Sequence, residues 1–125
     1  MWFWVFMLII DLLMPICFII FGLIYIKKPP EKINNYSGYR TSMSMKNSET
    51  WVFAHKAFGR ILLPLGCISL SIDVVVAVLI FNRNLITISI IGGIEVFVQL
   101  LSLFISFIFV ERTLKREFDK NGVHR

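Results

Sequence analysis

Each of the three long apolar runs in this sequence contains one carboxylic acid, and these are Asp11, Asp73 and Glu95. If the runs cross a membrane, each acid lies roughly eight to ten residues from the outer end of its run. At a helical rise of about 1.5 Å per residue, this places all three about 12–15 Å deep. An ionisable group at that depth costs about 3 kcal/mol, so acids at one common level indicate a contact or a site.

The residues around these acids predict that the acids face one another. Small and polar residues recur at helical spacing on the same side as Asp73 and Glu95, as in membrane helices that pack closely: Gly66, Ser69, Ala77, Gly92, Gln99, Ser102 and Ser106. Gln99 therefore joins the predicted intramembrane cluster. Two interpretations remain open, in which the acids are neutral hydrogen-bond donors between helices or hold a cation or protons.

A second set of polar residues lies in the longest polar segment, between the first and second runs. It consists of Gly38, Tyr39, Arg40, Thr41, Ser44, Lys46, Asn47, Thr50, Trp51 and His55. Arg40 could bind a phosphate or a carboxylate through two parallel hydrogen bonds, with Trp51 as an interfacial anchor. The alternative is a solvated positive loop on anionic lipid.

This second set does not predict catalysis or metal binding. A single histidine cannot form a metal site, and no nucleophile lies at a spacing that would make a triad with His55. Cys17 and Cys67 lie inside apolar runs and lack C-x-x-C spacing. We therefore expect no enzyme activity, no cofactor and no metal.

The order of residues in this segment resembles a known family. Tyr39-Arg40-Thr41, Ser44, Lys46-Asn47, Thr50-Trp51 and Ala54-His55-Lys56 resemble the motif of the SdpI-like family of small multi-pass bacterial membrane immunity proteins. The resemblance implies protection of the producing cell against a secreted, membrane-active peptide toxin, by binding or sequestration at the membrane. It also implies a signalling role through a cytoplasmic repressor.

Composition predicts an all-α membrane protein with one membrane domain. The chain has 125 residues, 57% of them hydrophobic, and its mean hydropathy is +0.76. We place transmembrane helices at about 2–26, 61–81 and 85–110, with a loop at 27–60 and a charged tail at 111–125 that is frayed at its end. The net charge of +5 comes from bases that flank these spans, so we expect no nucleic-acid binding.

The end of the 27–60 loop is predicted to be a helix on the membrane surface. Asn47 or Ser48 can cap it, and an apolar stripe follows at helical spacing: Trp51, Ala54, His55, Phe58 and Leu62. The stripe is expected to face the lipid, and Pro64 suits a bend from this interfacial amphipathic helix into the second span.

The distribution of bases predicts the orientation in the cell membrane. Seven Lys and Arg residues lie in the 27–60 loop and five in the tail, but only Arg83 lies in the turn at 82–84. Bases are enriched on the cytoplasmic side, so the loop and the C-terminus should be cytoplasmic and the N-terminus outside.

Two functions follow from these features. The first is the immunity protein that the resemblance implies, with the lipid bilayer, a peptide toxin or another membrane protein, and a repressor as partners. The second is a small ion- or proton-coupled carrier that uses Asp11, Asp73 and Glu95. In both, three spans make a thin bundle, so we expect a homo-oligomer.

Overall fold

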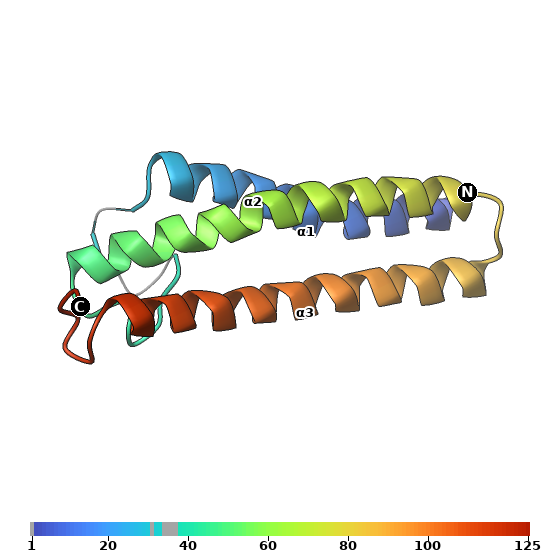
Figure 1. Cartoon of the computed structure of the whole chain (residues 1–125). Helices are drawn as coiled ribbons and strands as arrows, with labels where there is room; N and C mark the ends of the chain where they lie inside the picture. The colour runs from blue at the N-terminus through green and yellow to red at the C-terminus, as the bar shows by residue number, and fades with distance from the viewer. Residues whose placement is uncertain (1, 31, 34–37) are drawn as a thin grey trace.

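The computed structural model describes residues 2–30, 32–33 and 38–125, and this part of the chain is dominated by three long helices (Figure 1). They are α1 (Trp2–Lys27), α2 (Ser48–Leu79) and α3 (Leu85–Glu117). All three are long and apolar enough to cross a membrane. The prediction of an all-helical protein with three membrane-spanning helices is confirmed.

The predicted interfacial helix is wrong as a separate element, because α2 runs without interruption from Ser48 to Leu79 through Pro64. Its start was well predicted. Asn47 Oδ1 accepts a hydrogen bond from the Thr50 amide at 2.9 Å, and Thr50 Oγ1 accepts one from the Asn47 amide at 3.1 Å. These reciprocal bonds satisfy two amides that the first helical turn leaves unpaired.

The amphipathic stripe of α2 explains the error. All five of its members are buried inside the protein: Trp51, Ala54, His55, Phe58 and Leu62. An apolar stripe shows that a helix face avoids water, but it does not distinguish a lipid surface from a protein interior. Here the stripe packs against the rest of the chain, so residues 48–60 are the first turns of α2.

The helices α1 and α2 pack closely because glycines lie where they cross. A Cβ atom at Gly66 would lie 2.9 Å from both the Ile19 amide nitrogen and Phe18 Cβ. A Cβ atom at Gly22 would lie 2.8 Å from the Leu63 amide nitrogen. Small residues that allow backbones to approach in this way are common between membrane helices.

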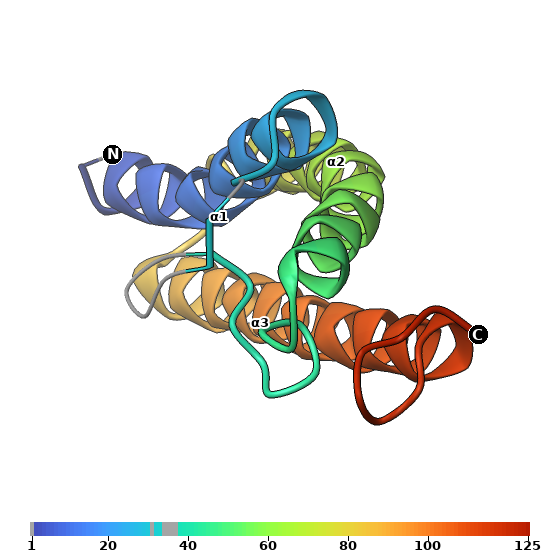
Figure 2. The same cartoon turned by 90° about the vertical axis from the view of Figure 1, so that its left-hand side faces the viewer.

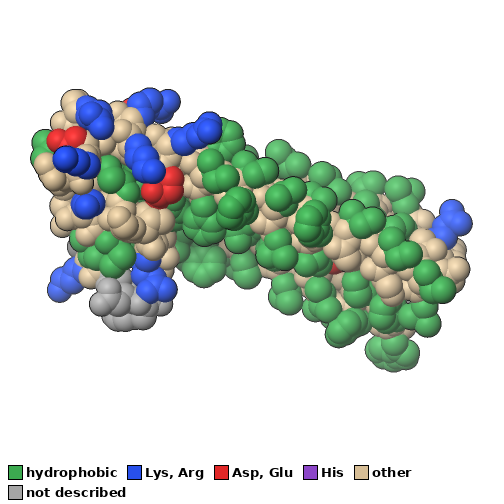
Figure 3. Space-filling model, turned by 90° about the horizontal axis from the view of Figure 1, so that it is seen from below, with side chains coloured by type: hydrophobic (Ala, Val, Ile, Leu, Met, Phe, Trp, Pro, Cys, Tyr) green, Lys and Arg blue, Asp and Glu red, His purple; other side chains and the backbone are tan. Residues whose placement is uncertain are grey.

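The buried apolar core lies toward the end of the bundle that carries the polar loop, which we call the loop end. Phe18 and Tyr25 of α1, Phe58 of α2 and Val110 and Leu114 of α3 belong to it. Figure 2 shows the loop and the chain end gathered over this end of the helices. Along the rest of the bundle, large apolar side chains cover the surface shown in Figure 3, as expected for a surface in contact with lipid.

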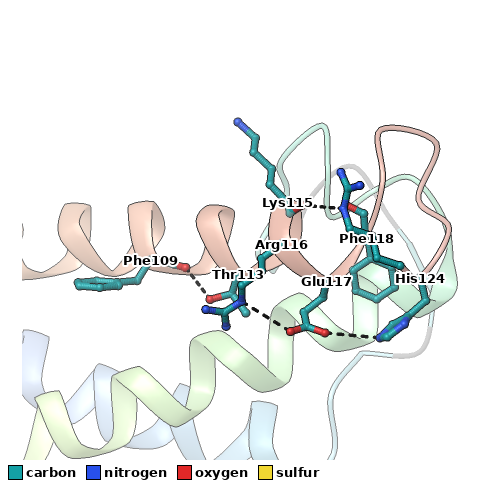
Figure 4. Close-up of polar contacts among 8 residues, drawn as sticks. Phe109, Thr113, Lys115, Arg116, Glu117, Phe118 and His124 are labelled. Atoms are coloured by element: carbon teal, nitrogen blue, oxygen red, sulfur yellow. Dashed lines mark hydrogen bonds and ion pairs between the residues drawn. The ribbon is translucent and has the colours of Figure 1, made fainter.

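The C-terminal segment is folded back, so the predicted fraying is wrong. The helix α3 continues seven residues beyond Val110 to Glu117, and Phe118 then forms a β-bridge with His124. The Arg125 amide donates to Glu117 O at 2.8 Å, and Glu117 forms a long ion pair with His124 at 3.7 Å (Figure 4). Backbone hydrogen bonds thus close the turn.

Candidate functional site

The first candidate site is the loop motif, whose members lie at the loop end. Gly38 has φ +95°, and a Cβ atom there would lie 2.5 Å from His55 Nε2. The Tyr39 amide donates to His55 Nε2 at 2.8 Å, while His55 Nδ1 lies 2.8 Å from Trp51 O. Because Nε2 accepts a hydrogen bond, the proton of the neutral imidazole must be on Nδ1, which donates to Trp51 O.

His55 is therefore a structural residue in this arrangement. Its side chain is fully buried, and both ring nitrogens are occupied by backbone groups. A neutral imidazole with both nitrogens bonded has no free position for a substrate or a metal ion. Its role is to bind the backbone at Tyr39 to the third turn of α2.

Two hydroxyl groups bond the backbone of the loop to itself and to α2. Ser44 Oγ accepts from the Thr41 amide at 2.9 Å and lies 3.0 Å from Tyr39 O, to which it can donate. Thr50 Oγ1 donates to Ser44 O at 3.0 Å. Ser44 and Thr50 are fully buried. A buried loop needs such partners for its backbone, and these residue types supply them.

Tyr39 connects the loop to α3. Its hydroxyl donates to Glu111 Oε1 at 2.9 Å, and its ring lies 5.1 Å from the ring of Phe58 and 5.3 Å from that of Phe107. Burial, with the Glu111 carboxylate beside it, raises the pKa of the Tyr39 phenol well above its ordinary value. The hydroxyl is therefore a permanent donor at physiological pH.

The charged members of the motif point outward, while the aromatic ones are internal. Arg40 and Lys46 are exposed. Trp51 is fully buried, and its ring centroid lies 4.3 Å from that of His55. The prediction of Trp51 as an interfacial anchor is wrong, because this indole fills the protein interior. The motif thus forms a bonded scaffold that presents two cations.

The second candidate site is the intramembrane cluster, which the structure assembles from all three helices. Gln99 Nε2 donates to Asp73 Oδ2 at 2.7 Å and to the backbone oxygen of Asp11 at 3.1 Å. Glu95 lines one small pocket together with Asp11 and another together with Asp73 and Gln99. Carboxyl groups that lie close together in a medium of low dielectric cannot all ionise, which favours protons in this cluster.

Several acceptors of the cluster have no partner within the described part of the chain. They are Asp11 Oδ1, Glu95 Oε1 and Gln99 Oε1. A cavity of about 220 Å³ lies beside them, lined by Ser69, Asp73, Glu95 and Gln99 among others. Within the described residues, no group of His, Cys, Asp and Glu side chains is placed to hold a metal ion. The geometry suits protons or a hydrogen-bond donor.

The contacts that close the two ends of the bundle have no signal in the sequence. Trp4 Nε1 donates to Ala77 O at 2.9 Å near the end of the bundle opposite the loop end. At the loop end, Asn47 Nδ2 donates to Gly122 O at 2.7 Å. Each bond joins residues more than 70 positions apart, and neither helical spacing nor charge indicates such pairs.

Comparison of the chain with known protein families gives a match, and the matched residues include the loop motif. The sequence model of the SdpI/YfhL protein family matches residues 31–110, more than half of the chain. The chain belongs to this family. No curated protein and no solved structure matches it.

The SdpI/YfhL match covers one candidate site more fully than the other. It includes the whole loop motif together with Asp73, Glu95 and Gln99. Asp11 and the C-terminal segment after Val110 lie outside it.

Proposed function

We propose that this protein is an immunity protein of the membrane, which protects the producing cell against a membrane-active peptide toxin. The family match over residues 31–110 is the observation that carries this proposal. Three membrane-length helices and an apolar outer surface are consistent with a protein that meets such a toxin in the bilayer. Arg40 and Lys46 are exposed at the loop end, and we assign the recognition of the toxin to these two side chains.

The proposed recognition takes place at the cytoplasmic face. Lys and Arg side chains gather at the loop end of the molecule (Figure 3), and the positive-inside rule assigns that end to the cytoplasm. A cysteine introduced at Ser42 should then react with a thiol reagent only after the membrane is made permeable. Reaction in intact cells would reverse the orientation.

Binding or sequestration of the toxin is the proposed mechanism, and a carboxylate of the toxin is a suitable partner for Arg40. The exposed apolar faces of the helices offer surface for the toxin or for a second copy of the chain. A cytoplasmic repressor held at the loop end is a further proposed partner. No chemical step is needed for any of these interactions.

Deletion and complementation test the proposal. Producing cells that lack the gene should lose viability at high density, and the wild-type gene on a plasmid should restore it. Purified inner membranes provide the control for abundance. Full viability of the deletion strain in medium conditioned by the producing strain would refute the immunity role.

A second candidate function, a proton-coupled carrier, rests on the intramembrane cluster. Three acids, one glutamine and a cavity lie together, with acceptors that lack partners among the described residues. The substitution Glu95→Gln keeps the size of the side chain, but the new amide group cannot ionise. It should abolish proton-linked uptake or efflux if the cluster relays protons, and toxin survival should remain if immunity acts through the loop. Loss of survival at normal abundance would favour the carrier.

A further inference from the structure

A cleft lies between the loop and the C-terminal segment; it shares Lys46 with the loop motif and lies apart from the intramembrane cluster. It has a volume of about 460 Å³. We call it the loop–tail cleft and define it by six of the residues that line it: Lys46, Lys115, Phe118, Asp119, Lys120 and Arg125. Most of these residues lie beyond the part of the chain that the family description matches.

The cleft is a built feature, because hydrogen bonds hold its walls. Asn47 Nδ2 donates to Gly122 O at 2.7 Å, which joins the turn of the C-terminal segment to the loop. Gly122 has φ +80°, and a Cβ atom there would lie 2.6 Å from Asn47 Nδ2. Arg125 Nε donates to Lys115 O and to Phe118 O, both at 3.2 Å. The cations therefore project from a closed turn.

The cleft has an excess of positive charge. Four Lys and Arg side chains and two carboxylates, Glu111 and Asp119, line it. Both carboxylates accept hydrogen bonds from the protein: Glu111 Oε1 from the Tyr39 hydroxyl, and Asp119 Oδ1 from the amides of Asn121 and Val123, all at 2.9 Å. These neutral donors stabilise both carboxylates without changing their charge, so the four cations still exceed the two anions in the lining.

The lysines of the cleft have no carboxylate partner among the described residues. The nearby Glu117 carboxylate lies 3.7 Å from Arg116 Nε and 3.7 Å from His124 Nε2, and none of these residues lines the cleft. Figure 4 shows Lys115 extending away from Glu117 and His124. Lys46, Lys115 and Lys120 are exposed. Their ammonium groups line one cleft and repel one another, and a bound anion would reduce this repulsion.

The position of the cleft indicates the source of the anion. Lys115 lies five residues beyond Val110, where the apolar run of α3 ends, which is roughly 7 Å along the helix. This is the level of the headgroups, just outside the hydrocarbon core. Exposed Phe104, Ile105 and Phe109 on α3 lie below it, where acyl chains would pack.

We propose that the loop–tail cleft binds the phosphate of an anionic phospholipid headgroup. We assign Lys46, Lys115 and Lys120 to the phosphate, while Phe118, which is almost fully buried, forms part of the wall of the cleft. Basic pockets on the cytoplasmic side of membrane helices bind lipid phosphates in this way. The positive charge of the cleft attracts a phosphate group. Because the cleft lies at the level of the lipid headgroups, it favours a lipid phosphate over soluble inorganic phosphate.

Lipid selectivity measured by electron paramagnetic resonance tests the proposal. The full chain is placed in phosphatidylcholine bilayers with a trace of spin-labelled phosphatidylglycerol or phosphatidylcholine, and the immobilised fraction of each label is compared. The wild type should prefer phosphatidylglycerol by about fivefold or more, since each base near a headgroup contributes a factor of about this size. The triple variant Lys46→Gln, Lys115→Gln, Lys120→Gln should show a preference within about twofold of unity.

A matched variant with the same change in net charge separates a site from a charged surface. Lys27, Lys28 and Lys56 are exposed and lie outside the residues that line the cleft. Their triple replacement by Gln should leave the lipid preference nearly at the wild-type value. Equal losses in the two triple variants, or no loss in either, would overturn the proposal. Helix content by circular dichroism shows that both variants are folded.

Inorganic phosphate distinguishes the two sources of the anion. Millimolar phosphate, added at constant ionic strength, should displace little of the labelled phosphatidylglycerol if the lipid is the ligand. Complete displacement by phosphate, but not by an equal charge of chloride, would overturn the assignment to lipid and leave a site for soluble phosphate. The binding readout does not depend on toxin immunity, so the two proposals can fail separately.

Discussion

Replacement of Gly38 by alanine should destabilise the protein, because two independent costs meet at this position. The residue has φ +95°, a conformation that costs an L-residue about 1 kcal/mol. The new Cβ would also lie 2.5 Å from His55 Nε2, so the imidazole must move. Its bond with the Tyr39 amide would be lost, which costs about 2 kcal/mol when the donor is buried.

The sum is a loss of about 3 kcal/mol in the free energy of unfolding, or roughly 10 °C in the melting temperature for a chain of this size. Thermal unfolding of the purified protein in mild detergent, followed by tryptophan fluorescence, measures the shift. Gly93→Ala is the matched control, because a Cβ atom at Gly93 meets no atom within 4 Å. Equal melting temperatures for the two variants would refute the role assigned to the bond between Tyr39 and His55.

Two further substitutions test the packing of the bundle and of the loop. Gly66→Leu should force α1 and α2 apart and lower the free energy of unfolding by about 3 kcal/mol, since its Cβ would lie 2.9 Å from the Ile19 backbone nitrogen; Gly93→Leu at the open position should have little effect in the same unfolding assay. Tyr39→Phe should cost about 1–2 kcal/mol by removing the donor to Glu111. The pKa of Tyr39 is raised on folding, so its contribution is complete below pH ~10 and is lost as the pH rises further. A Tyr39→Phe variant as stable as the wild type in the neutral range would contradict this.

The membrane character and the intramembrane cluster were accessible from the sequence. Long apolar runs have few physical solutions, and a lone acid in each run must avoid lipid, so Asp11, Asp73 and Glu95 were expected to face inward. In the structure Gln99 donates to Asp73 Oδ2 and to the backbone oxygen of Asp11, and Glu95 lines the same pocket as Asp73 and Gln99. Helical periodicity and the cost of a buried charge suffice for that inference.

The structure of the loop was not accessible in the same way. The residues of the motif were recognised, but their roles as internal hydrogen-bond partners depend on where the backbone passes His55. The turn of the C-terminal segment depends on Gly122, whose carbonyl oxygen accepts a hydrogen bond from the Asn47 side chain, 75 positions away in the sequence. Tertiary packing determines such pairs, and they cannot be predicted from local sequence patterns or from composition.

We propose that protection depends on Arg40, and survival of toxin-exposed cells that carry Arg40 variants is the measurement that tests this role. Arg40→Ala should lose protection at normal membrane abundance, and Arg40→Lys should restore little of it, because an ammonium cannot form the paired hydrogen bonds of a guanidinium. Lys56→Ala, which removes another exposed cation near the loop end, should protect fully. Full protection by Arg40→Ala would contradict the account.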